Sequence, residues 1–93
     1  MKKTIKSIRV ENFVSNNGNA IPNQFKITTQ DGTYFQSYDS IIVYEDRDGN
    51  ITLGNDWDYS KTTGKYRNIF LGEDKKETER KIKEGIYTVD TTL

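Results

Sequence analysis

Few residues of this chain have the types and spacing that chemistry requires, and segment 46–50 is the first candidate. Asp46, Asp48 and Asn50 place side-chain oxygens at alternate positions, as the first ligands of a calcium loop do. That loop also needs Gly at its sixth position and Glu at its twelfth, where this chain has Ile51 and Trp57. We therefore interpret this segment as a hairpin turn rather than a metal site.

The sequence Thr-Thr-Gly-Lys-Tyr at positions 62–66 matches the end of a phosphate-binding loop only in part. The loop requires another Gly five positions before Gly64 and a hydroxyl residue directly after the lysine. Tyr59 and Tyr66 occupy those two positions. The segment therefore does not predict a phosphate site.

Asp56 and Asp58 flank the single tryptophan, Trp57. Two carboxylates beside an aromatic ring suggest glycoside hydrolysis, which needs the two acids on opposite sides of a bound sugar. In an extended segment, residues two apart point the same way. We therefore favour the interpretation that these acids precede a capped helix.

The composition restricts catalysis further, because the chain contains no histidine and no cysteine. It therefore has neither the usual general base near neutral pH nor a thiolate nucleophile, and it cannot form disulfides. Carboxylates, lysines and tyrosines remain as catalytic groups. We expect a protein that is not an enzyme and that needs no cofactor and no metal.

The length of 93 residues predicts a single domain, 1–93. Apolar residues make up only 32% of the chain, so the six Tyr, four Phe and one Trp must supply much of the core. The chain has no apolar run long enough for a membrane span and no secretion signal after its first lysines. We therefore expect a soluble, intracellular protein with no membrane partner.

The pattern of apolar residues predicts an α+β fold, with a small antiparallel sheet of four to five strands and a C-terminal pair of short helices on one face. Segment 4–10 is rich in β-branched residues and predicts the first strand. Segment 15–23 is rich in Asn, with Gly18 and Pro22, and predicts a loop.

Two dipeptides, Asp31-Gly32 and Asp48-Gly49, predict the turns of two successive hairpins. The segment at positions 40–45, which precedes the second turn, is apolar on both faces, and this predicts a central position in the sheet. The strand before the first turn alternates, and the side chains predicted to share one of its faces are Phe25, Ile27 and Thr29.

The second half of the chain predicts two helices and an edge strand. Ser60 or Thr62 can cap the first helix, and Gly72 suits its end. Asp74 can cap the second helix, and segment 86–93 can return as an edge strand. Side chains predicted to close one face of the sheet are Trp57, Tyr59, Tyr66, Ile69 and Phe70. Side chains predicted to lie on the exposed side are Lys61, Lys65 and Arg67.

Tyr34 and Phe35 are adjacent in a predicted strand, so one ring should lie in the core and the other should be exposed. An exposed ring on a sheet can stack on a nucleic-acid base. The net charge is zero, with 14 basic and 14 acidic residues, and this balance disfavours contacts with phosphates. Nucleic acid is therefore an alternative partner rather than the first.

The runs "YFQSYDSIIVY", "WDYSKTTGKYRNIFLGE" and "KKETERKIKEGIYTV" resemble a family of short proteins of phages and mobile elements of Gram-positive bacteria. The similarity covers roughly residues 20–93, and "WDYS…TT.KYR..FLGE" is its most specific part. The resemblance implies an accessory protein in the cytoplasm of a bacterial host that binds a host protein, such as an inhibitor of host defence. It implies no functional residue.

A host protein is thus the partner we expect first. The expected partner-binding residues are Tyr38, Asp56, Lys61, Lys65 and Arg67. Two alternatives remain, a small nucleic-acid-binding module and a protein that sequesters a nucleotide or another small ligand. The oligomeric state stays open.

Overall fold

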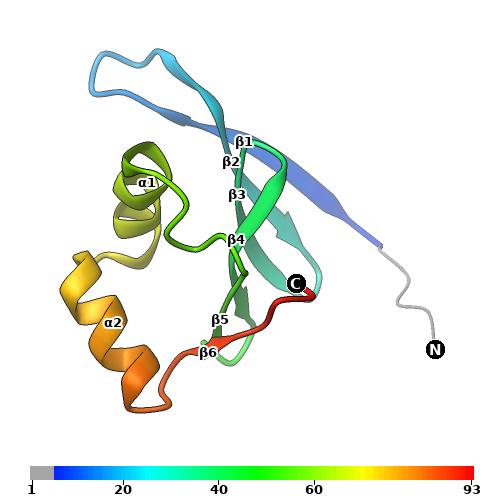
Figure 1. Cartoon of the computed structure of the whole chain (residues 1–93). Coiled ribbons are helices and arrows are strands. Elements are labelled where there is room, and N and C mark those ends of the chain that lie inside the picture. The colour runs from blue at the N-terminus through cyan, green and yellow to red at the C-terminus, as the bar shows by residue number, and fades with distance from the viewer. Residues whose placement is uncertain (1–5) are drawn as a thin grey trace.

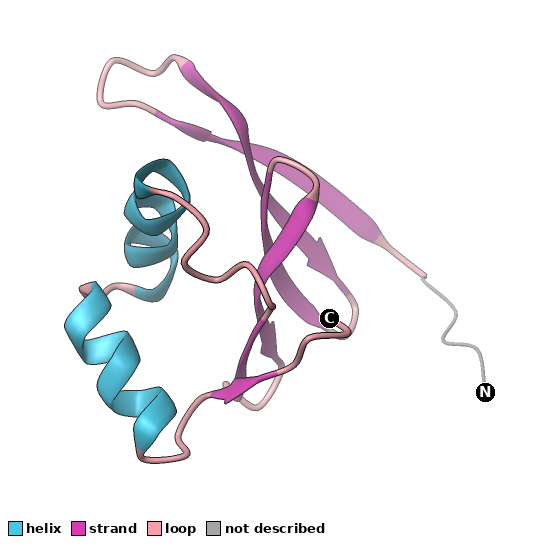
Figure 2. Cartoon of the chain, in the orientation of Figure 1, coloured by secondary structure: helices cyan, strands magenta, loops and turns pink. Residues whose placement is uncertain are grey.

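A computed structural model describes residues 6–93, which form one six-stranded sheet with two helices against one face (Figures 1 and 2). The strands are β1 (Ile8–Val14), β2 (Ala20–Thr29), β3 (Gly32–Ser37), β4 (Ser40–Asp46), β5 (Ile51–Leu53) and β6 (Thr88–Val89). The helices are α1 (Lys61–Leu71) and α2 (Lys75–Lys83). The predicted α+β class is therefore confirmed.

The sheet follows the order of the chain, β1-β2-β3-β4-β5-β6, and it has more strands than predicted. The first five strands pair antiparallel, whereas β6 pairs parallel to β5. The parallel pair arises because the two helices intervene and bring the chain back to the same end of the sheet. The Asp90 N–H donates to the Leu53 carbonyl over 2.8 Å and holds this edge strand in place.

The first strand differs from the prediction for segment 4–10. Residues 1–5 of the chain lie outside the described residues, and β1 continues beyond Val10 to Val14. The predicted loop 15–23 is correspondingly shorter, because β2 begins at Ala20 opposite Val14. The register shifts between Asn12 and Val14, and Pro22, which cannot donate to a ladder, lies in the stretch of β2 opposite this shift.

Both predicted hairpins are present. The Asp31-Gly32 turn joins β2 to β3, and the Asp48-Gly49 turn joins β4 to β5. The strand predicted to be central is β4, which lies between β3 and β5 and has Ile42 and Val43 almost completely buried.

Both helices have the predicted caps. The Ser60 hydroxyl accepts from the Thr63 N–H, and Gly72 ends α1 in the left-handed conformation at φ 72°. The Asp74 carboxylate accepts from the Glu77 N–H at the start of α2. No helix in the described part of the chain combines the length and apolarity needed to cross a bilayer.

The core lies between α1, α2 and the strands β3 to β5. Its buried hydrophobic residues are Phe35, Ile42, Val43, Leu53, Tyr66 and Tyr87. Trp57 and Phe70 pack against this core as predicted, but Ile69 and Tyr59 are 58% and 70% exposed. The expectation that Ile69 and Tyr59 cover the sheet is therefore wrong, because Tyr66 and Arg67 are the large buried side chains of α1 and Phe70 packs against the core, whereas Ile69 stays largely in solvent.

Candidate interaction surface

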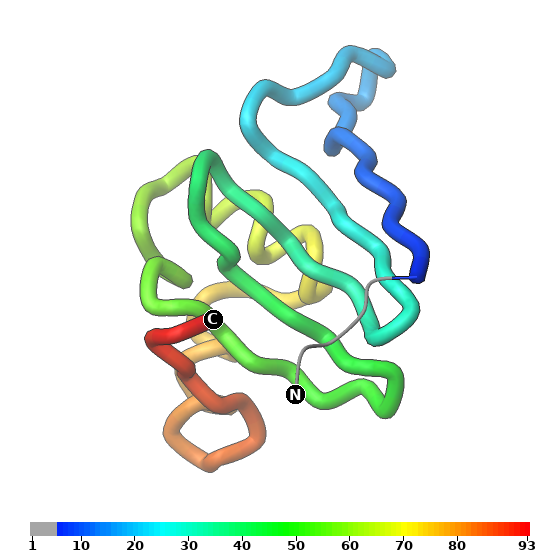
Figure 3. Tube along the Cα trace, turned by 90° about the vertical axis from the view of Figure 1, so that its right-hand side faces the viewer, coloured from blue at the N-terminus to red at the C-terminus, as the bar shows by residue number. Residues whose placement is uncertain are grey.

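One side of the sheet carries no helix. In the view of Figure 3 the strands lie in front and both helices lie behind them. We call this side the uncovered face. From the register, the strand residues on it are Ile8, Val10, Asn12, Phe25, Ile27, Thr29, Gly32, Tyr34, Gln36, Ile41, Tyr44, Asp46 and Thr52.

A continuous row of side chains crosses the middle of the uncovered face. Val10 lies opposite Ile27, Ile27 opposite Tyr34, and Tyr34 opposite Tyr44. The row ends at Thr52, which is opposite Tyr44. Val10 is 57% exposed, and the next three members are partly exposed. Four strands therefore present one apolar and aromatic strip to the outside.

The two tyrosines of this strip are stacked on each other. The ring centroids of Tyr34 and Tyr44 are 4.5 Å apart with an interplanar angle of 29°, and the Tyr44 hydroxyl donates to the Asp31 carbonyl over 3.0 Å. Phe35 points to the other side and is fully buried. The prediction that Tyr34 and Phe35 point in opposite directions is confirmed.

The helix side of the same strands has a different character. In one row Glu11 lies opposite Lys26, Lys26 opposite Phe35, and Phe35 opposite Val43. Glu11 and Lys26 are exposed, whereas Phe35 and Val43 are fully buried under the helices. The helix side of β1 and β2 thus carries the charged residues Arg9, Glu11 and Lys26, whereas the residues assigned to the uncovered face of these two strands are uncharged.

The sequence pattern predicted that three residues of the uncovered face, all on β2, lie together. The register confirms that Phe25, Ile27 and Thr29 share one face of β2. The sequence pattern did not show that this face has no helix over it. The strip residues Val10 and Tyr44 were not predicted as site residues, although the alternation along β4 is a signal that indicates Tyr44.

Two of the predicted site residues, Tyr38 and Asp56, lie together. They line a half-open hollow of about 550 Å³ between the β3–β4 turn and the start of α1. The Ser40 hydroxyl donates to the Asp56 carboxylate over 2.8 Å at the edge of this hollow. The hollow is lined by Ser37, Tyr38, Asp39, Ser40, Ile42, Asp56, Tyr59, Ser60, Thr62 and Thr63.

Tyr38 has a left-handed backbone, with φ 54°. A bulky residue rarely adopts this conformation, which costs about 1 kcal/mol. Two hydrogen bonds fix it, because the Tyr38 N–H donates to the Asn23 carbonyl over 2.8 Å and the Gln36 amide donates to the Tyr38 carbonyl over 2.6 Å. The turn therefore holds the 45% exposed Tyr38 side chain at the hollow.

The other three predicted site residues lie on α1, and only two of them are accessible. Lys61 and Lys65 are exposed as predicted, on a different side of α1 from the hollow, next to Asp58 and Asn68. Arg67 is only 1% exposed. The expectation that Arg67 lies on the exposed side is wrong, so its side chain cannot contact a partner directly in this conformation.

The two terminal nitrogens of the buried Arg67 guanidinium have acceptors, whereas its Nε has no hydrogen-bond partner among the described residues. One terminal nitrogen donates to the Trp57 carbonyl over 2.8 Å and to the Asp58 carboxylate over 3.2 Å, and the other donates to the Asn68 side chain over 2.9 Å. The guanidinium also lies 5.2 Å from the centroid of the Trp57 ring. Burial acts to raise the pKa of Asp58, but hydrogen bonds from Lys75 and Arg67 lower that pKa overall.

Asp46 also has a structural role. Its carboxylate accepts from the backbone N–H groups of Asp48 and Asn50, each over 2.9 Å, and from the Asn50 side chain over 3.1 Å. These hydrogen bonds hold the pKa of Asp46 below its ordinary value, the Asn50 N–H contributing most. The geometry is that of the turn predicted for this segment.

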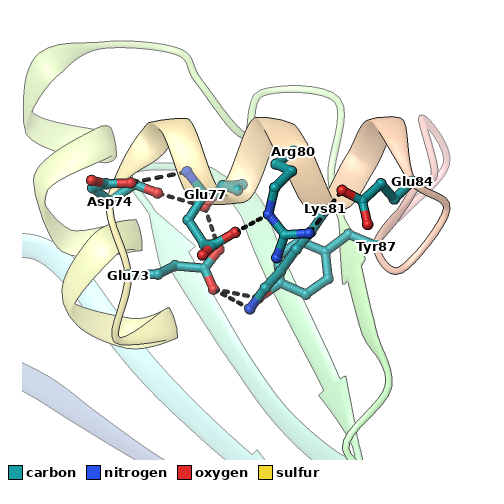
Figure 4. Close-up of polar contacts among 8 residues, drawn as sticks. Glu73, Asp74, Glu77, Arg80, Lys81, Glu84 and Tyr87 are labelled. Atoms are coloured by element: carbon teal, nitrogen blue, oxygen red, sulfur yellow. Dashed lines mark hydrogen bonds and ion pairs between the residues drawn. The ribbon is translucent and has the colours of Figure 1, made fainter.

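A polar cluster joins α2 to the C-terminal segment (Figure 4). Glu73 accepts from Lys81 and from the Tyr87 hydroxyl, each over 2.8 Å, and from the Thr78 hydroxyl over 2.6 Å. Burial acts to raise the pKa of Glu73, but these hydrogen bonds lower it overall. These hydrogen bonds tie Glu73 and α2 to the segment that follows the helix.

The comparisons with known proteins place the chain in a family without giving it an activity. The model of a family of unknown function, DUF8033, matches residues 8–85. The match covers most of the chain, so the chain belongs to this family. Neither the curated proteins nor the solved structures give a match.

Proposed function

We propose that this member of a family of unknown function acts without catalysis, by binding another protein through the uncovered face. The apolar strip from Val10 to Tyr44 is the observation that carries the proposal. Antiparallel sheets with one solvated face normally place polar residues on it. A contiguous apolar strip on that face is instead typical of a surface that another molecule covers.

The composition of the strip fits a protein partner. Protein interfaces are depleted in charged residues at their centre and enriched in tyrosine and other aromatic residues. None of the residues in the row from Val10 to Thr52 is Lys, Arg, Asp or Glu. The acid that the register places on this face, Asp46, lies at the end of β4, and its carboxylate accepts hydrogen bonds within its own turn. The stacked Tyr34 and Tyr44 give the strip a rigid aromatic centre, which loses little side-chain entropy on binding.

The partner that we propose is a protein of a bacterial host, and binding takes place in the cytoplasm of that host. The support is the resemblance of residues 20–93 to short proteins of phages and mobile elements. Inhibition of a defence component of the host is the form of this activity that we favour. The exposed Lys61 and Lys65 and the acidic side of the hollow at Asp56 could add polar contacts at the rim.

Nucleic acid has less support as the partner. The row of side chains between β1 and β5 contains no basic residue that could contact a phosphate. One face of the Tyr34 ring also lies against Tyr44 rather than open to a base. The hollow at Tyr38 is the observation that favours a small ligand, because its volume of about 550 Å³ suits such a molecule.

The test is a double variant of the strip, Ile27→Thr with Tyr34→Thr. Threonine keeps a high propensity for strands but removes the apolar surface. Tagged wild type should retain one stoichiometric protein from a lysate of a Gram-positive host, and the double variant should lose at least about 90% of it, since central aromatic residues dominate such contacts. Native mass spectrometry of the recovered protein measures the retained mass.

The matched control is Glu45→Thr, an exposed residue next to Tyr44 that lies on the helix side of the sheet. It should retain the same protein as wild type. Loss of the partner from both variants, or from neither, would contradict binding through the uncovered face. Recovery of an oligonucleotide or a small ligand in place of a protein would favour one of the two alternatives.

A further inference from the structure

The outer edge of β1 carries no neighbouring strand among the described residues. β1 is the first strand of the sheet and the outermost one in Figure 3, on the side away from β6. The regular part of its pairing with β2 runs from Ile8 to Asn12, and the register shift follows directly after it. Within these five residues centred on Val10, alternate residues direct their backbone N–H and C=O groups toward β2, and the residues between them direct theirs outward along the edge.

We propose that this edge pairs antiparallel with β1 of a second copy of the chain, around a twofold axis at Val10. Two identical antiparallel strands related by such an axis must place one residue opposite itself. Within the regular segment the central residue is Val10, and this choice uses all five of its residues. Val10 then meets Val10, Arg9 meets Glu11, and Ile8 meets Asn12 of the second copy.

The charges of β1 select this register. Arg9 and Glu11 are both exposed, and they lie on the same side of the sheet, with Arg9 Nε 3.4 Å from Glu11 Oε1. An axis at Arg9 would place two arginines opposite each other, and an axis at Glu11 would place two glutamates opposite each other. An axis at Val10 instead makes two Arg9–Glu11 pairs between the copies, and opposite charges across strands stabilise a sheet.

The apolar residues of the strand agree with the same register. Ile8 and Val10 are 59% and 57% exposed, on the side of β1 opposite to Arg9 and Glu11. Pairing at Val10 brings the two valines together, and it joins the uncovered faces of the two copies into one surface. Natural proteins usually protect a regular edge strand with charges or bulges, or by covering it, and here the Arg9–Glu11 pattern is complementary to itself.

The test uses charge reversal at the two paired positions. Arg9→Glu alone places Glu opposite Glu twice in a homodimer, and Glu11→Arg alone places Arg opposite Arg twice. Each single variant should dimerise at least about tenfold more weakly than wild type in sedimentation velocity at low salt. The double variant R9E/E11R exchanges the two charges and should regain the wild-type dimer.

A mixture of the two single variants gives the sharpest result. A heterodimer of R9E with E11R has Glu opposite Arg at both positions, so the mixture should dimerise where each variant alone does not. A monomeric wild type at submillimolar concentration, or single variants that dimerise like wild type, would overturn the proposal. The outcome does not depend on the strip variants, because Ile27 and Tyr34 lie on β2 and β3.

Discussion

Arg67 shows how a single charged side chain can hold two elements of this fold together. It lies within α1, yet its guanidinium is bonded to the Trp57 carbonyl and to Asp58 in the segment before the helix. Asp58 in turn pairs with Lys75 of α2 at 2.6 Å. This chain of contacts fixes the start of α2 relative to the segment that leaves the sheet.

Removal of the Arg67 side chain should therefore destabilise the protein. Arg67→Ala removes a buried side chain and leaves the Trp57 carbonyl without this donor, and we expect the free energy of unfolding to fall by about 2–4 kcal/mol. Urea denaturation at neutral pH measures the change. Lys65→Ala, an exposed residue of the same helix, should change it by less than about 0.5 kcal/mol. Equal effects of the two variants would refute a structural role for Arg67.

The carboxylate of Glu73 makes the stability of the fold depend on pH. Its pKa is lowered in the folded state, so the ionised form stabilises the fold. This contribution is fully present above the unfolded value of about 4.3, and it is lost as the pH falls through the lower folded value. Glu73→Gln should therefore be less stable than wild type at pH 7, and the gap should narrow below about pH 4.

Thermal denaturation of wild type and Glu73→Gln between neutral and acidic pH measures this gap. The variant keeps the size of the side chain, so packing is nearly unchanged. A difference in midpoint that is as large at acidic pH as at neutral pH would mean that the ionised carboxylate does not carry the contribution.

At the scale of the elements, two glycines have opposite roles, one inside α1 and the other directly after β5. Gly64 lies inside α1, and a Cβ there would be 3.5 Å from the nearest atom of the Arg67 guanidinium, an ordinary contact. Gly64→Ala should therefore raise the free energy of unfolding by about 1 kcal/mol, through helix propensity. A Cβ at Gly54 would lie 2.0 Å from the Ile41 carbonyl oxygen. Gly54→Ala should therefore lower the free energy of unfolding by about 1–3 kcal/mol.

Chemical denaturation of the two variants beside wild type tests this pair. Destabilisation by Gly64→Ala would show that α1 needs the glycine for close packing against Arg67. A neutral effect of Gly54→Ala would show that the backbone of β4 and β5 can separate at no cost.

The elements were largely predictable, because their signals are local. Aspartate-glycine dipeptides marked both hairpin turns, and Ser60 and Asp74 marked the helix starts. The extent of β1 was not predictable to the same degree. Pairing of Val14 with Ala20 depends on a partner strand and on a bulge near Pro22, and neither follows from the residues of β1 alone.

The candidate site was predictable only in part, for a reason of the same kind. Adjacent Tyr34 and Phe35 had to face opposite ways, but only the position of α1 decides which ring is covered. Periodicity places Arg67 at the margin of the helix, where a guanidinium either remains solvated or finds acceptors inside. The acceptors come from Trp57, Asp58 and Asn68, and the spacing of these residues does not specify their geometry.

For the molecule as a whole, the sheet separates two surfaces with different roles. The helix side contains the core and the polar cluster of α2, whereas the uncovered face carries the strip from Val10 to Tyr44. Pairing of two β1 edges would double this strip without burying it. A dimer could then engage two sites on a partner, with a gain in overall affinity from the second contact.

Site-specific photocrosslinking in a host lysate tests the central claim most directly. A photoreactive phenylalanine analogue replaces Tyr34 on the uncovered face in one protein and Glu45 on the helix side in another. We predict one discrete adduct with a host protein from position 34 and none from position 45. Adducts of equal yield from both positions, or an adduct at position 34 only with a second copy of the chain, would contradict a partner-binding role for the uncovered face.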